Sequence, residues 1–158
     1  DRRVARYAPD RLTGLMTRRT FNDQYRRLAA GVRRRQSGAL LLMLDVRELR
    51  TINDRHGYAV GDEVLKATAD ALLESTRTTD IVCRYGGDEF AVILVDIETA
   101  DVEPVSSRLR STVRAAIGRR RLPEDVRLTI GAAFASVPPD APEDLVREAY
   151  ADLHRRRG

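Results

Sequence analysis

The sequence has few of the features that mark secreted or membrane proteins. It contains one cysteine and no tryptophan, and no apolar run approaches the roughly 20 residues that a membrane-spanning helix needs. A single cysteine cannot form an internal disulfide, and Cys83 lies within an apolar stretch, where a small buried side chain is its expected role. Because no secretory signal pattern opens the chain either, we expect a cytoplasmic domain, or the cytoplasmic part of a larger protein, without membrane contacts of its own.

Neither sign of charge dominates the sequence, although its basic side chains are nearly all arginine. There are 28 Lys and Arg residues against 24 Asp and Glu, which gives a net charge of +4. The arginines cluster where helical patterns end, at residues 33–35, 119–121 and 155–157. Cations there complement the helix dipole, so solvated helix ends are the simpler interpretation, and we expect no binding to nucleic acid.

Apolar periodicity predicts alternating helices and strands over a chain whose 158 residues suit one domain. The predicted helices cover residues 17–35, 49–52, 60–76, 102–117 and 143–156. The predicted strands cover residues 39–46, 80–85, 89–95 and 126–135. One hairpin among alternating elements indicates a single sheet that contains antiparallel strands and is flanked by helices.

Residues Arg84 to Phe90 read RYGGDEF and lie between two apolar runs, 81–83 and 90–95. Two adjacent glycines between strands predict a tight hairpin turn with positive φ at its central positions. Asp88 and Glu89 follow at once and open directly into the apolar strand. Carboxylates at the end of a buried sheet are costly unless a cation or a partner uses them, so this stretch is a candidate metal site.

Several motifs together resemble the GGDEF family, the diguanylate cyclases that join two GTP molecules into cyclic di-GMP. In the family's order and spacing they are residues 10–15 (DRLTGL), 44–46 (LDV), 52–54 (IND), Gly57, 61–62 (GD), 84–90 and 129–133 (TIGAA). The resemblance implies an α/β (α+β) fold, the nucleotide-cyclase palm, in which helices flank a mostly antiparallel central sheet. It also implies that residues 1–9 end an upstream linker helix and that residues 10–158 form a GGDEF domain truncated at its C-terminal end.

The resemblance assigns the metal ligands and a catalytic carboxylate. Asp45, Asp88 and the backbone carbonyl of Val46 would hold Mg²⁺ or Mn²⁺, and Glu89 would act at the attacking hydroxyl. If the strands that end at Asp45 and begin at Asp88 are neighbours, both side chains meet at one end of the sheet. Taken alone, Asp45 has a simpler alternative role, capping the helix that follows its strand, and Glu89 has another, an ion pair with Arg84.

Asn53 and Asp62 match the family's guanine-binding pair. A carboxylate can accept the N1 and N2 hydrogens of guanine, which adenine does not offer together. Taken alone, Asn53 would form a turn and Asp62 would cap a helix. The other implied substrate contacts are phosphate contacts, made by the backbone amides of Glu48 and Leu49 and by the side chains of Arg50 and Arg157.

Residues 77–80 (RTTD) match the RxxD inhibitory motif that binds cyclic di-GMP in this family, with Arg108 as a third contributor. Arginine can bond a phosphate with two N–H groups, and the aspartate can accept from guanine. Without that context, Arg77 and Asp80 would be an ion pair at a helix end.

The sequence departs from the family pattern at several positions. Arg47 stands where most members have a second aspartate, Tyr150 replaces the usual aspartate, and His154 replaces the usual tyrosine. These changes leave Asp45 and the other acidic residues of the expected site in place. The predicted function is GTP condensation by a homodimer under an upstream sensory region; the alternative is a non-catalytic module that binds cyclic di-GMP or GTP as a regulatory signal.

Overall fold

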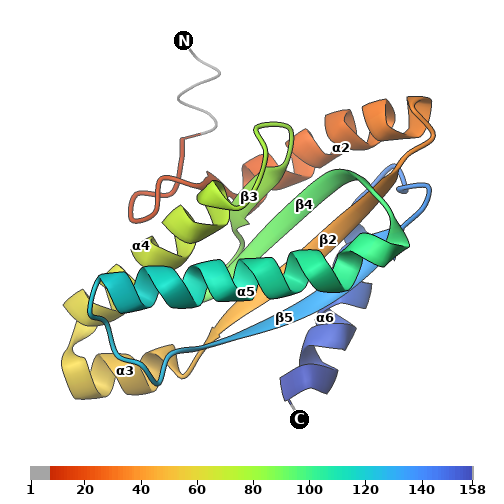
Figure 1. The fold of residues 1–158 in the computed structure, drawn as a ribbon. Helices are drawn as coiled ribbons and strands as arrows, with labels where there is room; N and C mark the ends of the chain where they lie inside the picture. The colour runs from red at the N-terminus through yellow and green to blue at the C-terminus, as the bar shows by residue number, and fades with distance from the viewer. Residues whose placement is uncertain (1–7, 158) are drawn as a thin grey trace.

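The computed structural model describes residues 8–157, which form one five-stranded sheet with helices on both faces (Figure 1). The end of a linker helix predicted over residues 1–9 therefore falls almost entirely outside the described residues. The elements are β1 (Met16–Thr17), α2 (Arg18–Arg34), β2 (Gly38–Arg47), α3 (Leu49–His56), α4 (Tyr58–Glu74), β3 (Ile81–Arg84), β4 (Glu89–Ile97), η1 (Thr99–Asp101), α5 (Val102–Arg119), β5 (Arg127–Ala135) and α6 (Glu143–Arg157).

The strand order β1-β3-β4-β2-β5 places β2 between β4 and β5, and β2 is antiparallel to both. Strand β3 also pairs with β4 in antiparallel fashion, and only the short β1 lies parallel to its neighbour. This confirms the expected mostly antiparallel sheet. It also places the end of β2 beside the start of β4, where the expected metal ligands lie.

Strand β2 is apolar along nearly its whole length because both of its faces are covered. Leu40, Leu42 and Leu44 pack with residues of α4 and α5, whereas Leu41 and Met43 pack with residues of α2 and α6. Figure 1 shows α5 across one face of the sheet. Burying each of these side chains contributes about 1.5–3 kcal/mol, so the sheet is a firm base for the groups at its ends.

The connection between β3 and β4 differs from the predicted tight turn. It spans residues 85–88, and neither Gly86 nor Gly87 has a positive φ. A Cβ atom on Gly86 would instead lie 2.7 Å from Oε1 of Glu89. The expectation of a primed turn is therefore wrong, and Gly86 makes room for a close side chain.

Two other local predictions need correction. Helix α4 begins at Tyr58 rather than at residue 60, because Gly57, with a φ of 90°, alone joins it to α3. Thr17 lies at the start of α2 as expected, but its side chain makes no capping hydrogen bond, and with Met16 it forms the unpredicted strand β1. Within residues 8–157, no helix is both long and apolar enough to cross a membrane.

Candidate active site

Two strand ends bring Asp45 and Asp88 together. Asp45 lies opposite Glu89 in the pairing of β2 with β4, and the Val46 amide donates a 2.9 Å hydrogen bond to the Asp88 carbonyl. A shared cation was expected only if these two strands are neighbours, and β2 and β4 are neighbours in the sheet. Asp45 does not cap α3, whose N-cap position is Glu48 and which has no side-chain capping bond.

Burial and two neighbouring charges act on the pKa of Asp45, and not all in the same direction. Asp45 is only 5% exposed, and burial raises its pKa above the ordinary value, with a further increase from Asp88 and an opposing decrease from Arg157. The Arg157 guanidinium forms an ion pair with Oδ2 of Asp45. Arg157 therefore contacts a predicted metal ligand, whereas the sequence assigned it to phosphate.

The donor set at these strand ends fits a hard cation. It offers two carboxylates and the Val46 carbonyl, and the ion pair with Arg157 engages only one oxygen of Asp45. Within residues 8–157, no group of three or more acidic, histidine or cysteine side chains lies close enough to hold a metal ion. Mg²⁺ suits such an incomplete set, because it keeps water and substrate phosphates among its ligands.

Glu89, the second acid after the glycines, is held by a different partner than the one expected. The Tyr150 hydroxyl on α6 donates a 3.1 Å hydrogen bond to Oε1 of Glu89. Arg84 instead pairs with Asp10 at 3.1 Å and donates to the Gly87 carbonyl at 2.7 Å. The alternative of a Glu89–Arg84 ion pair is therefore wrong.

The opening motif of the chain supports this loop. The Asp10 carboxylate accepts hydrogen bonds from the amide and the hydroxyl of Thr13, at 2.9 and 2.7 Å, and from Arg84. Burial opposes ionisation of Asp10, but these hydrogen bonds and the Arg84 charge bring its pKa below the ordinary value. Asp10 thus fixes Arg84 and, through it, the loop that carries Asp88. The sequence offered only one signal of this role, the presence of the opening motif.

A cavity of about 490 Å³ lies beside Asp88, within the range of small-molecule sites. It joins the ends of α3 and α4 to the 85–88 loop. Ten residues line it: Leu49, Arg50, Asn53, Asp54, Tyr58, Asp62, Leu65, Arg84, Gly87 and Asp88. Five of them are predicted substrate or metal residues, namely Leu49, Arg50, Asn53, Asp62 and Asp88. Of the expected substrate contacts, Glu48 and Arg157 are not among the residues that line this cavity.

Asn53 and Asp62 face this cavity from two adjacent helices. Asn53 lies within α3 and Asp62 within α4, so the alternatives of a turn former and a helix cap are wrong. Oδ1 of Asn53 is buried, and no group within residues 8–157 hydrogen-bonds to it. A buried polar atom that is left unpaired costs about 1–3 kcal/mol, which a hydrogen-bonding ligand would offset.

Helix α3 starts directly after the end of β2 that carries Asp45, the predicted metal ligand. Glu48 adopts a left-handed conformation, with a φ of 61°, and its carbonyl accepts the first helical hydrogen bond, from Ile52, at 3.0 Å. The turn aims the free amides of the first helical residues, including Leu49, past the strand end. Amides at a helix N-terminus favour anionic oxygens, which agrees with the phosphate role predicted for this segment.

The three residues of the expected inhibitory site line a second cavity, of about 760 Å³, between α4, β4 and α5. The Asp80 carboxylate is fully buried and accepts from the amides of Arg77 and Val95, at 2.8 and 3.2 Å. Arg108 reaches across from α5 and donates to the Ser75 carbonyl at 3.1 Å. Arg77 and Asp80 do form an ion pair, with Nε and Oδ2 3.5 Å apart, and the pair borders a cavity rather than an open surface.

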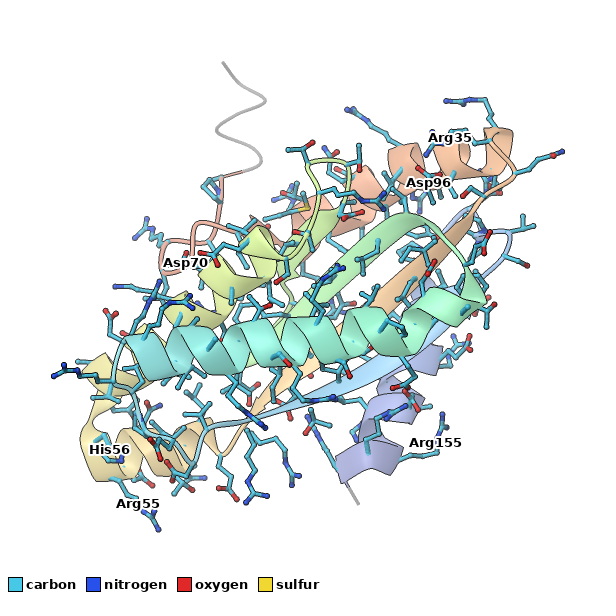
Figure 2. All side chains as sticks on the ribbon, viewed as in Figure 1. Arg35, Arg55, His56, Asp70, Asp96 and Arg155 are labelled. Atoms are coloured by element: carbon cyan, nitrogen blue, oxygen red, sulfur yellow. The ribbon has the colours of Figure 1, made fainter. Side chains whose placement is uncertain are left out.

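Asp96 also lines this cavity, where its charge would repel a phosphate. Arg35, the residue directly after α2, neutralises it through an ion pair of 3.1 Å, and Figure 2 shows the two residues near one another. The hydrogen bond from Arg35 lowers the pKa of Asp96. The cavity therefore presents Arg77 and Arg108 without an uncompensated negative charge from Asp96.

Comparisons with known proteins agree with this architecture. Residues 7–157 match the family model described as diguanylate cyclase, GGDEF domain. The chain is 35% identical over 153 residues to the response regulator PleD of Caulobacter vibrioides and 34% identical over 153 residues to the diguanylate cyclase DosC of Escherichia coli. Each alignment covers 94% of this chain, and the chain spans about a third (33%) of either relative. Among solved structures, the diguanylate cyclase SiaD of Pseudomonas aeruginosa, in complex with its activator SiaC, superposes with a TM-score of 0.82 at 28% identity, over 99% of this chain and 61% of that one.

Proposed function

The chain belongs to the GGDEF domain family, and from this premise we propose that it condenses two GTP molecules into cyclic di-GMP and two pyrophosphates. The observation that carries the proposal is the meeting of Asp45 and Asp88 at adjoining strand ends, next to the cavity lined by Asn53 and Asp62. Acidic metal ligands beside a nucleotide-sized cavity are what phosphoryl transfer requires.

In the proposed reaction, the 3′-oxygen of one GTP forms a bond to the α-phosphorus of the other. The bond between that phosphorus and the bridging oxygen breaks, and pyrophosphate leaves. A divalent cation, when bound by Asp45, Asp88 and the Val46 carbonyl, would stabilise the charge that builds on the phosphoryl oxygens. Glu89 would take the hydroxyl proton. Each domain holds one GTP, so two domains must face one another, and we propose that the catalytic form is a homodimer.

Substrate recognition would use both helices that border the cavity. Asp62 would accept the N1 and N2 hydrogens of guanine, and Asn53 would bond the base edge through its buried amide. Arg50 and the first amides of α3 would bind the triphosphate. Arg157 would reach the phosphates only by leaving Asp45, since its guanidinium is engaged there.

We further propose that the cavity lined by Arg77, Asp80 and Arg108 binds the product and inhibits the enzyme. The support is the convergence of two arginines on one concave surface of about 760 Å³, with Asp80 fixing the backbone of Arg77. Upstream regulatory regions would control how domains meet; SiaD, for comparison, is described in complex with an activator.

A second candidate is a non-catalytic module that binds cyclic di-GMP or GTP as a signal. The ion pair between Arg157 and Asp45 favours it, because a guanidinium already neutralises one expected metal ligand. Arg47, close to the same carboxylate, adds to the positive charge there.

Incubation of the full-length protein with GTP and Mg²⁺, followed by chromatography for cyclic di-GMP, separates the two candidates. We expect synthesis by the unsubstituted protein and a loss of at least about a hundredfold in Asp88→Ala, because a metal ligand is removed. Asp70→Ala is the matched control, since Asp70 is exposed on α4 (Figure 2) and, within residues 8–157, forms its ion pair with Arg120. Nucleotide binding without any turnover would select the regulatory module.

A further inference from the structure

The side chain of Glu89 lies between Gly86 and α6. The Tyr150 hydroxyl donates a 3.1 Å hydrogen bond to Oε1, across 61 residues of sequence. A Cβ atom built on Gly86 would lie 2.7 Å from the same oxygen, so only glycine at position 86 leaves room for it. The carboxylate therefore lies in the space beside Gly86, with one oxygen bonded to Tyr150 of α6.

The Tyr150 ring is itself fixed by aromatic neighbours. It meets Tyr85 edge to face, with ring centroids 6.2 Å apart, and stacks on His154 at 6.3 Å. Tyr85 is held in turn by Phe21, at 5.7 Å, and by the Arg18 guanidinium, 4.4 Å above its ring. Aromatic and cation–π contacts of this kind each contribute about 0.5–1.5 kcal/mol, so the packing of the ring determines where the hydroxyl lies.

The direction of the hydrogen bond is also determined. Burial raises the pKa of Tyr150, and the nearby Glu89 carboxylate raises it further. The phenol therefore keeps its proton and is the donor in its hydrogen bond with the Glu89 carboxylate. An ionised aspartate, the residue usual in the family at this position, has no proton to donate.

We propose that Tyr150 is a positioning residue for Glu89, holding one carboxylate oxygen so that the other faces the attacking hydroxyl of GTP. The inference rests on the proposed function, since it assigns Glu89 to the reaction. It concerns a residue that departs from the family pattern, and its contact joins α6 to the first residue of β4.

The kinetic test is Tyr150→Phe in the full-length protein, which removes the hydroxyl and keeps the ring. We expect kcat to fall about 10- to 100-fold while KM for GTP stays within about twofold, because orientation is lost and binding contacts remain. The matched control is Tyr25→Phe, whose hydroxyl donates a 2.7 Å hydrogen bond to the Pro139 carbonyl away from the site. That variant loses a comparable hydrogen bond and should keep both kinetic constants.

A double-mutant cycle gives a readout that does not depend on turnover. We expect the denaturation midpoints of Tyr150→Phe, Glu89→Ala and the double variant to be non-additive, since both changes remove the same hydrogen bond. Additive midpoints, or an active enzyme whose kcat is unchanged by Tyr150→Phe, would overturn the positioning role of Tyr150 and leave the proposed function standing. If the unsubstituted protein makes no cyclic di-GMP, the proposed function fails, and the positioning role fails with it.

Discussion

Gly61→Ala should weaken nucleotide binding without lowering the stability of the fold. Gly61 lies within α4, and a Cβ there would come within 1.7 Å of Oδ1 of Asn53. No real contact is that short, so the Asn53 side chain must turn away from its position over α4. That side chain is the proposed partner of the guanine base, and its movement should remove the contact.

The substitution should raise the free energy of unfolding and lower the affinity for the nucleotide. Replacing glycine by alanine within a helix favours folding by about 0.8–1.0 kcal/mol. Turning the Asn53 side chain away breaks no hydrogen bond of Oδ1, which has no hydrogen-bond partner in the described part of the chain. The free energy of unfolding should therefore rise by about 1 kcal/mol. Loss of the base contact should cost about 1–3 kcal/mol, which is about a 5- to 150-fold loss of affinity for the nucleotide.

The assay pairs urea denaturation with calorimetric binding of a GTP analogue whose α-phosphoryl group cannot be transferred. The control is Gly131→Ala, the same chemical change in β5. A Cβ on Gly131 would lie 2.3 Å from the Ala149 carbonyl oxygen and 2.4 Å from the Leu153 amide nitrogen, both in the backbone of α6. That overpacking should cost about 1–3 kcal/mol. Gly61→Ala with unchanged nucleotide affinity, or with lowered stability, would refute the reasoning.

Two further changes test the electrostatics of the sites. Asp45→Asn, studied without metal, should raise the denaturation midpoint at neutral pH, because burial and Asp88 raise the pKa of Asp45 and so disfavour its ionised form in the folded state. This advantage should shrink as the pH falls towards the ordinary aspartate pKa of 3.8, where Asp45 is itself protonated; an advantage that does not change with pH would contradict the cause. Arg77→Ala should weaken inhibition by cyclic di-GMP by at least about tenfold in an initial-rate assay, since a charged hydrogen-bond donor is removed, and undiminished inhibition would exclude Arg77 from the product site.

The sequence predicted the features that depend on local pattern. Apolar residues predicted the strand over residues 39–46, and the hairpin indicated antiparallel strands within one sheet flanked by helices. The meeting of Asp45 with Asp88 depended on a condition that the sequence left open, that their two strands are neighbours, and the pairing of β2 with β4 meets it. The resemblance paired Asn53 with Asp62, but the helix predicted over residues 49–52 stops before Asn53, which α3 contains.

Contacts that depend on side-chain packing between distant elements were not predictable. The ion pair of Arg157 with Asp45 spans 112 residues, and no periodicity relates the two positions. The exchange of the usual aspartate for Tyr150 was visible in the sequence, but its contact with Glu89 depends on how α6 packs against β5. The role of Gly86 was misread for a similar reason: backbone conformation was considered, and the approach of Glu89 was not.

The proposal depends above all on a divalent cation shared by Asp45, Asp88 and the nucleotide. It is tested most directly by the affinity for the GTP analogue measured in Mg²⁺ and in EDTA. We expect Mg²⁺ to tighten binding at least about tenfold in the unsubstituted protein, and the ratio to fall close to one when Asp45→Asn and Asp88→Asn are combined. A ratio that stays the same in the double variant would contradict a cation held by these two carboxylates.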